Sequence, residues 1–253
     1  MIDIHAHFAD EDYNIPEEWA KIKAAGVKRV VLASDTLEHS LMHAELAESL
    51  DGCYFTVGIH PAEADKDHAA DIMQYFSALA AREDCIAVGE IGLDYHYPDF
   101  DKERQRKLFI MQILLADGFR LPLQIHSRDA CADTLAILRE YRAYLKRGFL
   151  MHCYSYGKEE LEHFLELGAY FSFGGVTCFK NARRVVESVE SCPMERILSE
   201  TDSPYLSPFR GEKNTPANIP VIVKKLAEIK SISPEEMSAI IDENAERLFL
   251  KLS

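Results

Sequence analysis

The sequence predicts a TIM-like (β/α)8 barrel with an additional C-terminal helix. Its 253 residues match the size at which such a barrel closes as a single domain, here residues 1–253. Short apolar or β-branched runs recur at intervals of about 20–36 residues, and segments with helical periodicity separate them. Because each connection passes through a helix, we expect parallel strands. A doubly wound open sheet is the alternative, because a count of strands does not prove closure.

Eight runs are the expected strands. In chain order they cover residues 2–4, 29–32, 54–57, 86–88, 122–125, 149–151, 169–172 and 196–198. Apolar stripes at three- and four-residue spacing predict helices between and after them. Examples are Leu108, Met111 and Leu115, then Leu135, Leu138 and Tyr141, and later Ile219, Ile222, Val223 and Leu226.

The sequence S-P-E-E at 233–236 predicts the start of the last helix. Ser233 suits the N-cap, Pro234 the first helical position and Glu236 a capping box. The apolar stripe that follows consists of Met237, Ile240, Ile241, Ala245 and Leu248. Before this helix, residues 203–220 contain four prolines. We expect them to form a long ordered loop at the active face of the barrel.

Charge and composition limit the class of protein. The chain has 28 Lys and Arg residues against 42 Asp and Glu residues, a formal net charge of −14, so broad electrostatic binding to a long duplex is not expected. A local site that binds metal cations can still attract a phosphate, because the cations supply positive charge where the phosphate binds. The six cysteines contain no C-x-x-C pair, the N-terminus lacks secretory features, and no apolar window is long enough to span a membrane. We expect a cytoplasmic protein with no membrane association and no stable protein partner.

Two histidines end the first expected strand, in the sequence His5-Ala6-His7. Residues two apart on a strand point to the same side, so both imidazoles can bind one metal ion. The pair alone is weak support, because the chain has 10 histidines. The ends of the other strands decide whether it belongs to a site.

Four further ionisable residues follow other expected strands. Glu90 comes after the fourth strand, His126 after the fifth and His152 after the sixth, and Asp202 closes the segment that contains the eighth. The carboxyl ends of all strands meet at one mouth of a barrel, where this fold places its active site. The pattern therefore predicts a metal centre made of His5, His7, Glu90, His126, His152 and Asp202.

Four imidazoles and two carboxylates exceed the three protein ligands typical of one catalytic zinc. We therefore expect two divalent metal ions. One would be held by His5, His7, Glu90 and Asp202, and the other by Glu90, His126 and His152, with Glu90 shared. The histidine-rich set favours Zn, Mn, Fe or Ni over a dedicated Mg site, and the choice among Zn, Mn and Mg stays open.

Glu90 and Asp202 are the expected catalytic residues. Paired ions about 3.5–4 Å apart stabilise attacking and leaving oxygens and lower the pKa of bound water toward ~7. Asp202 can also take the proton of the attacking water. This chemistry suits hydrolysis of an ester-type bond.

Seven motifs resemble those of the TatD family of metal-dependent hydrolases, within the wider amidohydrolase-like barrels. They are D-I-H-A-H (3–7), V-G-I-H-P (57–61), G-E-I-G-L-D-Y (89–95), L-P-L-Q-I-H-S-R (121–128), M-H-C-Y-S (151–155), L-S-E-T-D-S-P-Y-L (198–206) and N-A-E-R-L-F (244–249). They occur in family order across almost the whole chain. As an ordered set they are specific to the family, and less so to one substrate within it.

The resemblance implies a TIM-like barrel, dependence on divalent metal, and deoxyribonuclease activity that is often 3′-to-5′ exonucleolytic. The substrate would be a DNA end or single-stranded DNA, and the same six positions would bind metal. Two segments depart from the family pattern: H-C-Y-S-Y-G at 152–157, where many relatives resemble H-x-F-S-G, and H-Y-P at 96–98 after Tyr95. Both are near the expected pocket and bear on substrate choice.

Three residues beside the expected ligands have two readings each. His60 can bind a substrate phosphate or support the site, or it is a loop histidine without a catalytic part. Arg128 can pair bidentately with a phosphate, or it forms a salt bridge with an acid such as Asp129. Glu200 either orients a metal-binding histidine or belongs to a buried ion pair. We take His60 and Arg128 as the substrate-binding candidates.

Other polar residues near the mouth carry weaker signals. Asp94 and Tyr95 follow Glu90 on a loop, where the phenol can contact substrate or simply pack. His96 is unassigned. Cys153 adjoins His152, and because neighbours on a strand point to opposite faces, its thiol is expected to leave the site and pack in the core.

Three classes of function compete. The first is phosphodiester hydrolysis at a nucleic-acid end, with basic residues after the seventh strand as backbone contacts or as a solvated helix face (Lys180, Arg183 and Arg184). The second is hydrolysis of a carboxylic ester, amide, lactone or aminoacyl ester by the same binuclear site. The third, a non-catalytic metal-binding or scaffold protein, predicts a broken ligand set, whereas all six positions are intact.

Overall fold

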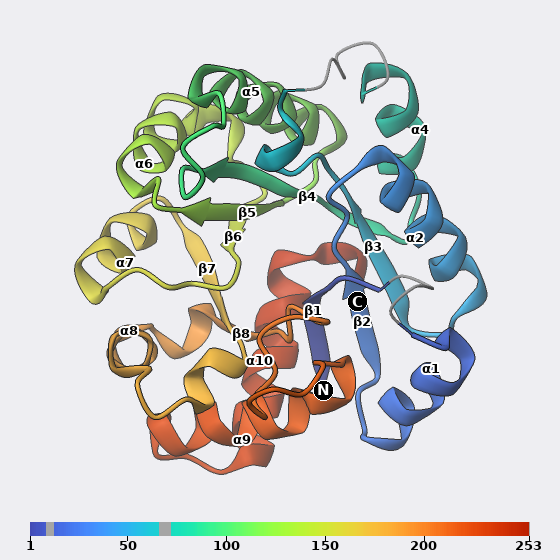
Figure 1. Cartoon of the computed structure of the whole chain (residues 1–253), viewed down its shortest axis with the longest axis vertical. Helices are drawn as coiled ribbons and strands as arrows, with labels where there is room; N and C mark the ends of the chain where they lie inside the picture. Colours follow the sequence, from blue (N-terminus) through green and yellow to red (C-terminus); the bar gives the residue numbers. More distant parts are fainter. Residues whose placement is uncertain (9–12, 66–71, 253) are drawn as a thin grey trace.

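The computed structural model describes residues 1–8, 13–65 and 72–252. Eight parallel strands form one sheet whose spatial order follows the chain. The strands are β1 (Ile2–Ala6), β2 (Arg29–Leu32), β3 (Cys53–Val57), β4 (Cys85–Asp94), β5 (Leu123–Arg128), β6 (Phe149–Met151), β7 (Ala169–Phe173) and β8 (Ile197–Ser199). Figure 1 shows them arranged around a central axis with helices outside.

The predicted barrel is confirmed, and the doubly wound alternative is wrong. A doubly wound sheet reverses its strand order at a switch point, whereas this order runs from β1 to β8 without reversal. The first and last strands also meet at their carboxyl ends. The Asp202 backbone N–H donates to the His5 carbonyl at 2.9 Å, and the His7 N–H donates to the Ser203 carbonyl at 2.7 Å.

Helices follow the strands and surround the sheet (Figure 1). They are α1 (Ile15–Ala24), α2 (Leu37–Ser49), α4 (Ser77–Ala80), α5 (Lys102–Phe119), α6 (Cys131–Glu140), α7 (Lys158–Leu165), α8 (Arg183–Ser191), α9 (Ile219–Lys230) and α10 (Pro234–Leu248). Side chains satisfy the free N–H groups at several starts. Asp101 accepts from the N–H groups of Glu103 and Arg104, and Ser233 accepts from that of Glu236. No helix among the described residues is long and apolar enough to cross a membrane.

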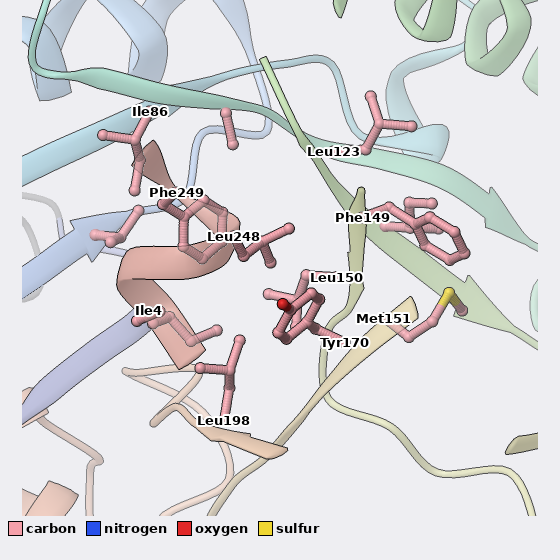
Figure 2. Packing of buried hydrophobic residues seen from close by; sticks show 14 of the residues in the cluster. Ile4, Ile86, Leu123, Phe149, Leu150, Met151, Tyr170, Leu198, Leu248 and Phe249 are labelled. Atoms are coloured by element: carbon pink, nitrogen blue, oxygen red, sulfur yellow. The ribbon is translucent and has the colours of Figure 1, made fainter. Parts of the chain in front are cut away.

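The additional helix α10 covers the amino-terminal end of the barrel. Asn244 donates to the carbonyl of Ile197 at the start of β8, and Glu246 pairs with Arg29 at the start of β2. Figure 2 shows Leu248 and Phe249 projecting among strand residues from several sides of the barrel, which include Ile4, Ile86, Leu150 and Leu198. Apolar side chains therefore fill the amino-terminal end of the barrel, and ionisable side chains gather at the carboxyl-terminal end.

Two element boundaries differ from the sequence prediction. The strand β4 continues to Asp94, well beyond the predicted 86–88, because it goes on pairing with β5 as far as Asp94 opposite Arg128. The loop after β8 ends before residue 216, where a short helix (Pro216–Asn218) leads into α9. Prolines occupy the first turns of both helices, where a missing N–H costs nothing, so they begin helices here instead of extending the loop.

Candidate metal centre

The structure brings the six predicted ligands together around Glu90. One carboxylate oxygen, Oε2, lies 3.4 Å from His5 Nε2 and 3.5 Å from His7 Nε2. Asp202 Oδ1 lies 3.8 Å and 3.5 Å from the same two nitrogens. Donor atoms of His5, His7 and Asp202 all lie within 4.8 Å of one another.

The other oxygen of Glu90 faces a second group of imidazoles. Oε1 lies 2.8 Å from His126 Nδ1 and 2.9 Å from His152 Nε2. These two nitrogens are 3.3 Å apart. His60 Nε2 approaches the same oxygen to 3.5 Å. Glu90 therefore divides its two oxygens between two sets of imidazoles.

Irregular backbone places the carboxylates in this position. The register of β4 against β5 shifts between Val88 and Ile91, and the Glu90 N–H donates to the Ser34 carbonyl at 2.7 Å. A Cβ at Gly58 would lie 2.4 Å from the carbonyl carbon of Gly89, so only glycine lets the loop that carries His60 come this close. Asp202 has a φ of 55°, a left-handed conformation that turns its side chain out of strand alternation.

Outer polar partners orient three of the imidazoles, two of them through hydrogen bonds and the third across an ion-pair distance. His5 Nδ1 lies 3.0 Å from Gln124 Oε1, and His126 Nε2 lies 3.2 Å from Asp94 Oδ2. His152 Nδ1 faces the buried Glu200, whose Oε2 is 3.7 Å away. Such partners hold the proton on the outer nitrogen, so the inner nitrogen offers a lone pair.

This donor set fits divalent metal. His5 Nε2 is a buried polar atom without a hydrogen-bond partner, although its outer nitrogen is satisfied by Gln124. A buried lone pair costs free energy unless something binds it. Nitrogen ligands at about 2.0–2.1 Å from a tetrahedral ion lie about 3.3 Å apart, close to the separations within the first group. The arrangement can hold cations, as the sequence predicts.

His60 differs from the other imidazoles in its tautomer. Its Nδ1 accepts the Ala62 backbone N–H at 3.1 Å, so the proton of the neutral ring is on Nε2, which faces Glu90. Burial lowers the pKa of His60 to about 4, despite the opposing charge of Glu90, so the ring is neutral near pH 7. An Nε2–H group donates a hydrogen bond and offers no lone pair to a metal, which favours the substrate-binding reading.

The buried carboxylates and imidazoles hold one another in their charged forms. Burial alone would raise the pKa of Glu90, but His152 and His126 outweigh it and lower that pKa well below its ordinary value. Burial likewise opposes the charge on His7, yet Asp202 and Glu90 raise its pKa to about 9. A cation at the site would displace such protons, because imidazole binds metal only through its neutral form.

Asp3 ties β1 to the segment that carries Asp202. Its Oδ1 accepts the backbone N–H groups of Thr201 at 3.0 Å and His5 at 3.3 Å. Its Oδ2 accepts the Thr201 hydroxyl at 2.5 Å. The barrel is therefore fastened next to two of the metal-binding candidates.

The replacement Asp3→Asn is expected to flatten the pH dependence of stability. Burial raises the pKa of Asp3 to about 8 from an ordinary 3.8, although the hydrogen bonds from Thr201 oppose the shift. The protonated Asp3 therefore contributes to the free energy of unfolding. This contribution is fully present below the pKa that Asp3 has in the unfolded chain, and it is lost as pH rises through about 8. Thermal unfolding between about pH 5 and about pH 9 should show the Tm of the variant rising relative to the original. A constant difference, equal to that of the exposed control Asp99→Asn, would contradict this.

Arg128 and its neighbours form the rim beside β4 and β5. The guanidinium lies 5.7 Å from the centre of the exposed Tyr97 ring. Asp129, the expected salt-bridge partner of Arg128, instead pairs with His96 Nδ1 at 3.0 Å. The Tyr95 hydroxyl donates to Asp133 at 2.7 Å, which supports its reading as a packed loop residue.

Two of the three basic residues after β7 pair with acids outside the centre. Arg183 Nε lies 2.8 Å from Glu187, and Arg184 lies 3.6 Å from Glu160. Lys180 and Arg183 line a cavity of about 500 Å³ beside α8 and α9. These contacts favour a solvated helix face.

The expected direction of the Cys153 side chain is wrong. The strand β6 ends at Met151, and Cys153 has a φ of 44°, so alternation does not extend to it. Its thiol contacts Glu200 and lies within the field of Asp202. Burial, reinforced by these acids, raises the pKa of Cys153 well above its ordinary value. A thiol that stays protonated is a poor nucleophile, so the position of Cys153 near these acids does not make it one.

Sequence reasoning missed two residues that orient ligands. Asp94 was expected on a loop, but it is the last residue of β4 and contacts His126. Gln124 had no assigned role, yet it contacts His5. The same signal could have found both, since Asp94 is four residues after Glu90 and Gln124 two before His126, which places each on the ligand face of its strand.

Comparison with known proteins gives a consistent family. A profile described as TatD related DNase matches residues 2–250. The chain is 37% identical over 253 residues to the uncharacterized metal-dependent hydrolase YabD of Bacillus subtilis (strain 168), covering 98% of both chains. It is 31% identical to the 3′-5′ ssDNA/RNA exonuclease TatD of Citrobacter rodentium (strain ICC168), covering 98% of this chain and 97% of the relative.

Solved structures agree with this result. The crystal structure of YjjV, a TatD homologue from Escherichia coli K12, superposes with a TM-score of 0.92 at 28% sequence identity. The superposition covers 99% of this chain and 98% of that chain. The likeness therefore extends over the whole barrel, including the strands that carry the metal-centre residues.

Proposed function

Because this chain belongs to the TatD-related DNase family of metal-dependent hydrolases, we propose that it cleaves phosphodiester bonds at an end of single-stranded nucleic acid. The observation that supports this most is the division of the two Glu90 oxygens between two groups of imidazoles. Paired cations suit phosphodiester cleavage, because they stabilise both the attacking and the leaving oxygen. The name of the Citrobacter rodentium relative supports single strands as substrate and a 3′-to-5′ polarity.

The metal centre is assigned as follows. One ion would be held by His5, His7, Asp202 and one oxygen of Glu90, and a second by the other oxygen of Glu90 with His126 and His152. When bound, the ions would polarise the phosphate and lower the pKa of the attacking water. Imidazole-rich donors fit Zn or Mn better than Mg.

Residues of the chain supply the remaining steps. Burial alone would raise the pKa of Asp202, but His7 and the other imidazoles lower it, so the carboxylate is ionised and can take the proton of the attacking water. His60 Nε2–H donates a hydrogen bond to a phosphate oxygen. Arg128 binds the next phosphate at the rim, where its guanidinium is exposed.

The proposed reaction is tested on end-labelled single-stranded DNA with added Mg, Mn or Zn, beside a panel of carboxylic esters, amides and lactones. We expect metal-dependent release of nucleotides from the 3′ end and little turnover of the carbonyl compounds. Hydrolysis of carbonyl esters with no action on DNA would overturn the nuclease proposal in favour of acyl chemistry at the same centre.

Loss of the Asp94 carboxylate is expected to weaken metal binding without removing a ligand. Partners of metal-binding histidines typically contribute about 10–100-fold to affinity or activity. Asp94→Ala should therefore raise the metal concentration needed for half-maximal activity by about that factor. An exposed aspartate on the loop that follows β4 provides the control, Asp99→Ala. Equal metal requirements in the two variants would rule out the orienting role.

Two broader assignments accompany this function. We propose that residues 1–253 act as one domain, which the single eight-stranded sheet supports. We also propose a cytoplasmic location, supported by six cysteines that are all free thiols, because reducing compartments keep cysteines in that state.

A further inference from the structure

An exposed aromatic and apolar surface lies on the loop after β8, next to the metal centre. Tyr205, Leu206 and Phe209 are 62%, 39% and 44% exposed. The Tyr205 ring centre lies 6.1 Å from that of His7, at an interplanar angle of 68°. Other large exposed apolar side chains in the described ranges lie singly on separate elements, such as Leu114 on α5 and Val221 on α9. A cluster at the mouth therefore points to a binding surface.

The backbone of Tyr205 is held rigidly despite the exposure of its side chain. Its N–H donates to the Asp202 carbonyl at 2.9 Å, and its carbonyl accepts from Asn214 Nδ2 at 2.7 Å. The buried Asn214 side chain also donates to the Thr201 carbonyl at 2.7 Å. Thr201 is in turn fixed to β1 through Asp3. The backbone that carries the ring is therefore already ordered, which lowers the entropic cost of binding a ligand there.

Positively charged side chains lie near this surface and also on the rim beside β4 and β5. Arg210 is exposed on the same loop as Tyr205. Beside β4 and β5, Tyr97 is 52% exposed with Arg128 over its ring. Aromatic rings next to cations are the combination that binds single-stranded nucleic acid, where bases stack and phosphates are neutralised.

We propose that the β8-loop surface, led by Tyr205, stacks on the nucleobase adjacent to the phosphate that is cleaved. This inference rests on the proposed nuclease function and names the part of the substrate that the site recognises. In a nucleotide only one sugar separates the phosphate from its base. A phosphate placed among the metal ligands therefore leaves that base within reach of a ring beside His7. Every base can stack on a ring, so the surface would favour unpaired strands without favouring a particular sequence.

The test compares two single-stranded oligonucleotides that differ only at the end that is cleaved. One carries ordinary nucleotides there, and the other carries tetrahydrofuran units, which keep the phosphodiester and lack the base. We measure the ratio of their kcat/KM values for the original protein and for Tyr205→Ala, Tyr205→Phe and Tyr144→Ala. Tyr144 is an exposed control, at 43%, in the short helix Arg142–Tyr144 that precedes β6, so it lies at the opposite end of the barrel.

Stacking on one base contributes about 1–3 kcal/mol, so the original protein should prefer the base-bearing end by roughly 5- to 150-fold. Tyr205→Ala should lower that ratio toward one, whereas Tyr205→Phe and Tyr144→Ala should keep most of it. An equal fall of both kcat/KM values in Tyr205→Ala, or no preference in the original protein, would overturn the stacking surface and leave the nuclease function standing. Failure to cleave either oligonucleotide with any added metal would instead overturn the nuclease function and the surface with it.

Discussion

Glu90→Ala is expected to lower hydrolysis of single-stranded DNA by more than about 100-fold while the barrel stays folded. Residues that only support metal ligands typically contribute 10–100-fold. Glu90 should exceed this range, because its two oxygens serve both imidazole groups, at 3.4 Å from His5 and 2.8 Å from His126. The fold should survive, because the apolar side chains that pack around Leu248 and Phe249 fill the opposite end of the barrel.

The measurement combines a steady-state assay, metal content and thermal unfolding. Glu190→Ala, which removes an exposed glutamate on α8, should behave like the original protein in all three. Glu90→Ala should bind fewer ions and unfold cooperatively. A Glu90→Ala variant with an unchanged metal content and full activity would show that this carboxylate is not shared between two ions.

Asp202→Asn is expected to reduce kcat by about 10²–10⁴-fold, the range typical of a lost general base. The amide keeps the shape of the side chain but cannot take a proton from the attacking water. Its effect should differ from that of Glu90→Ala, because His126 and His152 remain paired with Glu90. KM should therefore change less than kcat.

Single-turnover rates provide the direct comparison for Asp202→Asn, with Asp99→Asn as the matched surface control. The two variants carry the same chemical change, so a difference between them reports position alone. An Asp202→Asn rate within about tenfold of the original would assign proton transfer to another group, since general-base contributions are larger than that.

The barrel and the six central residues could be predicted because both depend on strand ends. Apolar runs of strand length separated by helical stripes specify a parallel α/β sheet. Residues that follow those runs then fall at one mouth of the barrel. The prediction needed only the position of Glu90 or His126 along its strand, and no knowledge of side-chain contacts.

Strand parity failed where the backbone leaves regular geometry. Cys153 follows the end of β6 and has a positive φ, so its thiol turns toward Glu200 instead of away. The extent of β4 was also missed: Asp94 was assigned to a loop because the expected strand ended at residue 88, although β4 continues to Asp94. The end of a strand and the backbone conformation after it depend on contacts with distant segments. The apolar pattern of one strand does not contain that information.

Other features depend on hydrogen bonds that only the folded chain forms. The Ala62 N–H donates to His60 Nδ1 and so fixes the ring proton on Nε2. This contact decides that His60 acts as a hydrogen-bond donor and not as a metal ligand. The apolar stripe of α10 predicted that this helix is buried, but not that it covers the amino end of the barrel. The rigid presentation of Tyr205 likewise requires the buried Asn214, nine residues later.

We propose that the six side chains of the metal centre hold two divalent ions, and that the reaction requires both. Elemental analysis of protein stripped with chelator and then titrated with Mn or Zn tests it directly, with cleavage of single-stranded DNA followed in the same samples. We predict no cleavage in the stripped protein and a return of activity that is complete only at about two equivalents of metal per chain. Undiminished turnover in chelator, or full activity at one equivalent, would show that the reaction does not require two ions.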